Sequence, residues 1–293
     1  MSAGSLFLPL GAGFGYACGA IAVKRAMGER VSGRLVNLVC NGVMALAFQC
    51  LWFFPGPSVP PALLPKPFLC GLLFFLGQVM TFRAIATGEV SVATPLLGTK
   101  VVLVALFSVL VIGKPLPGSW WTASLLASMG IILVSVSPGT PRRRAAEAVA
   151  WSLGAAATFA LTDVLVQKWV PEVGYGRFAP LMFGIMGVFS LVHLLPHRRS
   201  EGSGPGWVVT PWLVAGALLL ALQAFGMYSA IGLYGSAALT NILYGSRCLW
   251  SVLLVWMLGS FAGDTARHGQ ARWVMPVRFA GALLLVAAMA LVL

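Results

Sequence analysis

The chain has 293 residues, of which 59% are hydrophobic and only 9% are charged, and its mean hydropathy is +0.92. Soluble domains carry about 25% charged residues, so this composition excludes a soluble globule and predicts an integral membrane protein. The net charge of +12 comes from basic residues scattered through short loops, which is the pattern of contact with anionic lipid headgroups rather than with nucleic acid.

Ten apolar runs of about 18–25 residues follow one another along the chain, each long enough to cross a bilayer as a helix. In chain order they are Ser5–Val23, Leu35–Phe54, Pro67–Thr87, Val90–Ile112, Ser119–Val136, Ala148–Val170, Phe178–Leu195, Trp212–Leu233, Gly235–Leu258 and Val274–Leu293. The connections are short, and none is large enough for a catalytic domain outside the membrane. The sequence therefore predicts an all-α integral membrane fold with ten transmembrane helices.

A basic linker, residues 138–146, divides the chain into residues 1–137 and 147–293, with five spans in each part. The two parts resemble each other, because Leu10–Ala17 aligns without a gap with Leu153–Ala160. Each part has an odd number of spans, so the two copies must cross the membrane in opposite directions. We therefore expect two inverted five-helix repeats.

The fourth and ninth spans each carry a basic residue near the middle of an apolar run. Lys100 lies within Gly88–Ile112, and Arg247 is the only charge of Gly235–Leu258. A charge at the centre of a spanning helix opposes insertion by about 2.5–3.5 kcal/mol, so the default interpretation of such a residue is functional. Pro95 cannot donate a backbone hydrogen bond and is expected to kink the helix ahead of Lys100.

Further polar residues are expected at the depth of these two cations. One face of the predicted ninth helix carries four of them at helical spacing: Thr240, Tyr244, Arg247 and Ser251. Gln78 of the third span corresponds to Gln223 of the eighth, and both lie near the middle of their spans. Repeats that meet at the membrane midplane usually form the substrate site there. The candidate substrate-binding residues are Lys100, Arg247, Gln78, Gln223, Asn241 and Tyr244.

Asp163, in the sixth span, is the one acidic residue well inside a predicted helix. If it pairs with Lys100 or Arg247, one cation remains uncompensated. Asp163 is either such a counter-ion or a proton carrier, because burial raises the affinity of a carboxylate for protons. Two interpretations of the cations stay open: at least one contacts substrate, or both are structural.

No residues have the spacing of a metal, redox or catalytic site. The five cysteines lie in or beside apolar runs, and His193 and His197 flank two arginines at a membrane edge. Nothing resembles a nucleophile with its base. We expect no metal, no cofactor and no enzymatic activity.

Two segments around the fourth span carry a family resemblance: Ala93-Thr94-Pro95-Leu96 and Leu110-Val111-Ile112-Gly113-Lys114. Together with ten spans in two inverted halves, they resemble the drug/metabolite transporter superfamily in its EamA-like branch. The resemblance implies secondary transport of small metabolites by alternating access. Lys100 is also similar to a phosphate-binding position of the organic-phosphate translocators, whose usual Lys-Arg pair in the ninth span is here Ser246-Arg247.

The orientation of the chain has two conflicting indications. Twelve basic residues fall on one side of the predicted bundle and four on the other, which makes the first side cytoplasmic and places both termini outside. The family resemblance implies cytoplasmic termini instead.

The leading hypothesis is a secondary active transporter in the plasma (inner) membrane. It carries a small anionic or zwitterionic metabolite, a carboxylate or phosphate ester, whose charge Lys100 and Arg247 neutralise. Its partners are that substrate, membrane lipid and a coupling ion or counter-substrate. One alternative is a proton-coupled exporter of amino acids or of amphiphilic or cationic compounds, driven through Asp163. Another is a lipid-handling or structural membrane protein.

Overall fold

The computed structural model describes residues 3–29, 31–54, 56–87, 96–135, 145–194, 207–258 and 274–293. Pro95, Glu89 and linker residues 138–144 lie outside these ranges, so the predicted kink at Pro95 and most of the predicted linker are not described. The regular structure of the described residues is entirely helical.

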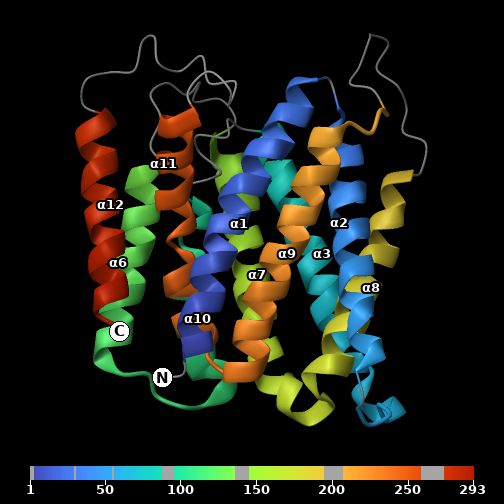
Figure 1. The fold of residues 1–293 in the computed structure, drawn as a ribbon. Coiled ribbons are helices and arrows are strands. Elements are labelled where there is room, and N and C mark those ends of the chain that lie inside the picture. The colour runs from blue at the N-terminus through green and yellow to red at the C-terminus, as the bar shows by residue number, and fades with distance from the viewer. Residues whose placement is uncertain are drawn as a thin grey trace.

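The helices of the first part of the chain alternate in direction across the bundle (Figure 1). They are α1 (Ala3–Gly28), α2 (Gly33–Gln49), α3 (Pro65–Thr87), α5 (Lys100–Phe107) and α6 (Gly118–Val134), with short 3-10 helices at Cys50–Phe53 and Pro61–Leu63 and a π-helix, η3, at Ser108–Ile112.

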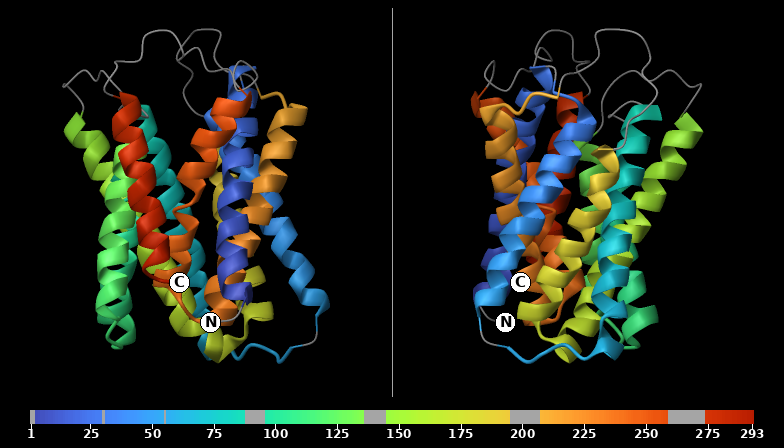
Figure 2. Two further views of the ribbon diagram at one scale, coloured as in Figure 1. Left: turned by 60° about the vertical axis from the view of Figure 1, so that its left-hand side comes forward. Right: turned by 90° about the vertical axis from the view of Figure 1, so that its right-hand side faces the viewer.

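The second part begins with α7 at the end of the bundle opposite to that where α1 begins (Figure 1). Its helices are α7 (Ala145–Val173), α8 (Tyr175–Ser190), α9 (Pro211–Tyr234), α10 (Ala237–Tyr244), α11 (Arg247–Leu258) and α12 (Val274–Ala290), with a 3-10 helix at Leu191–Leu194. Both chain termini lie at the same end (Figure 1), and Figure 2 shows from two more sides that the helices run side by side along one direction.

Six stretches are long and apolar enough to cross a membrane: Ala3–Gly28, Gly33–Phe53, Pro61–Thr81, Ala146–Val173, Tyr175–Leu194 and Pro211–Tyr234. Three shorter apolar helices are found in the described residues, at Lys100–Ile112, Gly118–Val134 and Pro276–Ala290. Large apolar side chains such as Leu222 and Phe279 are about two-thirds exposed, as suits a surface surrounded by lipid. The chain is therefore a multi-pass membrane protein, and the count of ten spans remains a prediction.

Local sequence signals fix several helix ends. Ser32 accepts a hydrogen bond from the Leu35 amide at the start of α2, and Thr210 does the same for Leu213 at the start of α9. Gly235 ends α9 with φ of 64°, a left-handed conformation that glycine adopts without strain, and its amide donates to the Ile231 carbonyl.

Most of the extensive helix contacts join the two parts of the chain. α1 packs on α9, α3 on α7, α2 on α8, and α6 on α12. α6 and α12 approach each other closely where both carry a glycine: a Cβ atom placed on Gly281 of α12 would lie only 2.8 Å from the Gly130 carbonyl oxygen of α6. The two parts therefore pack closely against each other through these helix pairs.

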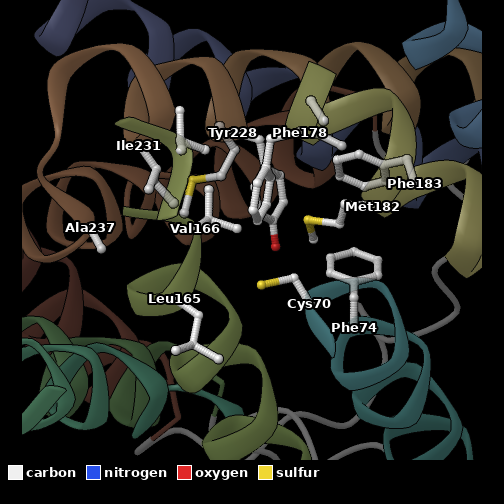
Figure 3. Close-up of a cluster of buried hydrophobic side chains, with 14 of the residues drawn as sticks. Cys70, Phe74, Leu165, Val166, Phe178, Met182, Phe183, Tyr228, Ile231 and Ala237 are labelled. Atoms are coloured by element: carbon white, nitrogen blue, oxygen red, sulfur yellow. The ribbon is translucent and has the colours of Figure 1, made fainter. Parts of the chain in front are cut away.

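The largest buried apolar cluster lies between α2, α3, α7, α8 and α9. Phe48 stacks on Phe183 at 3.8 Å between ring centroids, and Figure 3 shows Phe74, Phe183 and Tyr228 close together within this cluster. A second cluster joins α5, α6, α10 and α12 around Leu243 and Leu285. α5 and α10, which carry Lys100, Asn241 and Tyr244, contribute residues to both clusters.

The described basic residues divide between the two ends of the bundle. Those near the end opposite the termini are Lys24, Arg25, Arg34 and Arg278, and those near the end with the termini are Lys66, Lys114, Lys168 and Arg177. This is the division that the sequence predicts for these eight residues, and it leaves the orientation in the membrane as a prediction.

Candidate functional site

The two membrane-embedded cations both follow a break in their helix. Residues 96 and 97 are helical, Gly98 and Thr99 form a turn, and the helix resumes at Lys100. In the same way Gly245 and Ser246 form a turn between α10 and α11. The prediction of one continuous ninth helix is therefore wrong, and the polar face drawn along it is interrupted at this turn.

The freed backbone groups at both breaks find partners close by. Across the second break, the Cys248 amide donates to the Gly245 carbonyl at 3.1 Å, which is a tight 3-10 turn. At the first break, the Ser128 hydroxyl of α6 donates to the Gly98 carbonyl at 3.0 Å. Such satisfaction by neighbouring helices is what makes broken helices tolerable at membrane depth.

Lys100 forms an ion pair with Asp163. Its Nζ lies 2.7 Å from Asp163 Oδ2, and Asp163 is fully buried whereas the Lys100 side chain is 15% exposed. Asn241 Nδ2 also donates to Oδ2 at 2.7 Å, and the Tyr228 hydroxyl donates to Oδ1 at 3.1 Å. Both carboxylate oxygens are thus satisfied by groups from three other helices, α5, α9 and α10.

Apolar rings surround this polar cluster. The Tyr228 ring packs edge-to-face against Phe74 and Phe183, and Figure 3 shows its hydroxyl pointing into the space between Cys70 and Met182. The Phe159 ring lies 5.8 Å from Lys100 Nζ. In such low-dielectric surroundings an unpaired carboxylate is strongly disfavoured, which explains why Asp163 collects three donors.

Arg247 has aromatic rather than acidic neighbours. Its guanidinium carbon lies 5.0 Å from the Tyr16 ring centroid and 4.6 Å from that of Tyr244, and the side chain is half-buried. Within the described residues, no carboxylate oxygen lies within 4.0 Å of a guanidinium nitrogen of Arg247. Cation–π contacts stabilise the charge in place without neutralising it.

The two cations stand in related settings, one in each part of the chain. The gap-free alignment of Leu10–Ala17 with Leu153–Ala160 matches Tyr16 with Phe159, and these rings cover Arg247 and Lys100 respectively. Continued three residues beyond Ala17, the same alignment matches Ala20 with Asp163. α1 therefore offers a methyl group where α7 offers the carboxylate that neutralises Lys100.

The structure brings some of the predicted site residues together and leaves others apart. Asn241 binds Asp163, and Tyr244 covers Arg247, whose charge acts on Lys100. Gln78 and Gln223 are half-buried on α3 and α9 and show no hydrogen bond within the described residues. The Gln223 Cβ lies beside α1, 3.6 Å from where a Cβ on Gly15 would stand.

Sequence reasoning did not assign Tyr16, Phe159 and Tyr228 to the site. The alignment that pairs Tyr16 with Phe159 carried a usable signal, because both aromatic residues fall in first helices of the predicted repeats. Tyr228 carried none, since its role depends on which face of α9 meets α7.

The structure shows a groove of about 310 Å³ away from these residues. It is lined mainly by apolar side chains of α3 and α8, among them Phe68, Ile185 and Phe189, with Gln49 at the end of α2, and it touches none of the seven candidate residues. No group of three or more histidine, cysteine, aspartate or glutamate residues that could hold a metal ion occurs in the described part of the chain.

Comparisons with known proteins relate the first part of the chain to a family. Residues 3–136 match the sequence model of the EamA-like transporter family. Among solved structures, the fold is similar to that of a protein whose crystal structure is described only as that of a protein. The match covers 100% of this chain and 97% of the other chain, with a TM-score of 0.72 and 16% sequence identity. At that identity the likeness shows the fold alone. No curated protein matches the sequence.

Proposed function

We propose a secondary active transporter for a small anionic or zwitterionic metabolite, on the premise that residues 3–136 are an EamA-like transporter domain of the drug/metabolite transporter superfamily. The family indicates a membrane transporter with a small-molecule substrate and a lipid environment, and its members are transporters rather than typical enzymes. Alternating access at a midplane site and placement in the plasma (inner) membrane are parts of the proposal.

The observation that carries the substrate class is the uncompensated Arg247. A guanidinium held between Tyr16 and Tyr244, with no acidic partner among the described residues, presents its N–H donors in a planar fork. Such a fork binds a carboxylate or phosphate through two parallel hydrogen bonds. Arg247 is therefore the principal anion-binding residue of the proposal.

The charges of the cluster favour a substrate with one net negative charge or a zwitterion. Lys100 and Asp163 neutralise each other, which leaves the charge of Arg247 as the net charge of the three groups. This ion pair supports the interpretation of Asp163 as the counter-ion of Lys100. It does not favour the alternative, in which a free Asp163 carboxylate binds a cationic substrate. Gln78, Gln223 and Tyr244 would then orient the substrate through uncharged contacts.

The proposed transport cycle needs two equivalent halves, and the helix contacts support them. In the proposed repeat, α1, α2 and α3 correspond to α7, α8 and α9. α1 packs on α9 just as its counterpart α7 packs on α3, and α2 packs on α9 just as its counterpart α8 packs on α3. These are the relations that an inverted repeat of residues 1–137 in residues 147–293 requires. We propose that the chain has ten spans in two five-helix repeats joined by residues 138–146.

A thermal-shift measurement on the purified protein tests the proposed substrate class. The probes are acetate, lactate, glutamate, inorganic phosphate and alanine, with choline as a cation. A ligand at 100 times its dissociation constant stabilises the folded state by about 2.7 kcal/mol. We expect stabilisation by at least one anion or zwitterion and none by choline.

Three variants locate the binding residue. Arg247→Gln should abolish the shift, and so should Ala20→Asp, which would supply the missing carboxylate to Arg247. Arg177→Gln is the matched control, because Arg177 also lies 5.0 Å from an aromatic ring, that of Trp52, but near the end of the bundle. Shifts that survive in Arg247→Gln, or stabilisation by choline alone, would contradict the proposal.

A further inference from the structure

The Lys100–Asp163 pair lies beside the proposed anion site, and its two members differ in access. Asp163 is fully buried, whereas the Lys100 side chain is partly exposed. α10 links the pair to Arg247, because Asn241 donates to Asp163 and Tyr244, three residues further along the same helix, covers Arg247. An anion that binds Arg247 therefore meets the ammonium of Lys100 and not the carboxylate. It competes with Asp163 for the same cation.

Separation of the pair would leave Asp163 in unfavourable surroundings. Its remaining donors would be the Asn241 amide and the Tyr228 hydroxyl, within the apolar cluster of Phe74 and Phe183. A buried carboxylate without its cation is relieved most simply by binding a proton. When Lys100 moves away, the proton can reach Oδ2, the oxygen that Lys100 contacted in the ion pair.

The groups that act on Asp163 come from four helices packed against α7. They are Lys100 of α5, Tyr228 of α9, the thiol of Cys70 of α3 and the neutral amide of Asn241 of α10. α8 also packs on α7, but its own Tyr175 and Arg177 bond elsewhere, to Ser229 and Gly56. Lys100 is thus the one cation of the described residues that pairs with Asp163.

We propose that Asp163 binds one proton each time the site binds an anion, so that the protein moves an anion together with a proton. The proton comes from a hydronium ion of the solution: one O–H bond of hydronium breaks and leaves water, and one O–H bond forms on the Asp163 carboxylate. The net charge of Arg247, Lys100, Asp163 and cargo is then the same before and after loading. The inference rests on the proposed function and adds the coupling ion to it.

The affinity for an anion measures this coupling. If one proton accompanies each anion, the dissociation constant for lactate falls about tenfold for each pH unit by which the pH is lowered, because binding and protonation are linked. Lactate stays ionised between about pH 6 and pH 8, so its own titration does not contribute. Asp163→Asn, which cannot take the proton, should bind lactate with the same affinity across that range.

Direct proton counting covers the case in which Asp163→Asn does not fold. Lactate added to the wild-type protein in weakly buffered solution with a pH-indicator dye should remove one proton from solution per anion bound. Glu172→Gln, which removes an exposed carboxylate paired with Lys66, is the control and should behave like the wild type. If lactate is not the anion selected by the thermal-shift screen, acetate or glutamate replaces it.

The two hypotheses fail in different ways. Anion binding that depends on Arg247 but takes up no proton and has no pH slope overturns the proton coupling and leaves the proposed transport intact. A slope that persists in Asp163→Asn also overturns it, because the proton then binds elsewhere. Absence of any Arg247-dependent anion binding overturns both.

Discussion

Replacement of Lys100 by glutamine leaves the fully buried Asp163 carboxylate without its cation. Asn241 and Tyr228 would still donate to it, but no positive charge would remain within 4.0 Å among the described residues. Removal of one partner of a buried ion pair costs about 3–5 kcal/mol, because an uncompensated charge stays in a low-dielectric interior. We expect Lys100→Gln to lower the free energy of unfolding by that amount at neutral pH.

The chain supplies its own control for this prediction. Lys66 and Glu172 also form an ion pair, but their side chains are 23% and 47% exposed, and exposed pairs contribute about 0–1 kcal/mol. Lys66→Gln should therefore cost at least about 2 kcal/mol less than Lys100→Gln. The double variant Lys100→Gln/Asp163→Asn should recover part of the loss, since no buried charge remains.

Unfolding of the purified protein in mixed micelles by sodium dodecyl sulfate, followed by circular dichroism, compares these variants. Equal costs for Lys100→Gln and Lys66→Gln at neutral pH would refute the reasoning, as would a double variant that is less stable than both single ones.

Two further predictions concern packing between the two parts of the chain. Gly281→Val should sharply lower the melting temperature, because its Cβ would lie 2.8 Å from the Gly130 carbonyl oxygen. Gly11→Ala meets nothing within 4 Å and should not lower it, because alanine favours a helix over glycine by about 1 kcal/mol. Ser190→Ala removes a 2.7 Å hydrogen bond from buried Asn41 and should cost about 1 kcal/mol in the same unfolding measurement, while a cost near zero would show that water replaces the hydroxyl.

Much of the fold could be predicted because apolar length is a strong signal in membrane proteins. The predicted run Trp212–Leu233 corresponds to α9 at Pro211–Tyr234, and the other described helices agree with their runs to within a few residues, apart from the fourth and ninth spans. The break at Gly245 could not be predicted, since one glycine costs a helix only about 1 kcal/mol. The break packs directly against α1, where a Cβ atom on Gly13 would lie only 2.7 Å from Ser246 Oγ. Its position therefore depends on contacts between helices and not on the local sequence.

The site was predicted by residue type better than by arrangement. Charges at membrane depth single out Lys100, Asp163 and Arg247 from the sequence alone, because burial of a charge in lipid is so costly. Which cation Asp163 neutralises depends on helix rotation and on the depth of each break, and a single sequence does not encode either in a local pattern. The structure pairs it with Lys100 and leaves Arg247 to the aromatic rings.

Uptake into proteoliposomes tests the central proposal, that Arg247 carries an anion across the membrane. Radiolabelled lactate, glutamate or phosphate, whichever stabilises the protein most, should accumulate in a saturable manner with the wild type and with Arg177→Gln. The same uptake should fall at least about tenfold with Arg247→Gln, which corresponds to loss of about 1.4 kcal/mol or more of anion binding. Equal uptake by Arg247→Gln and the wild type would contradict the account.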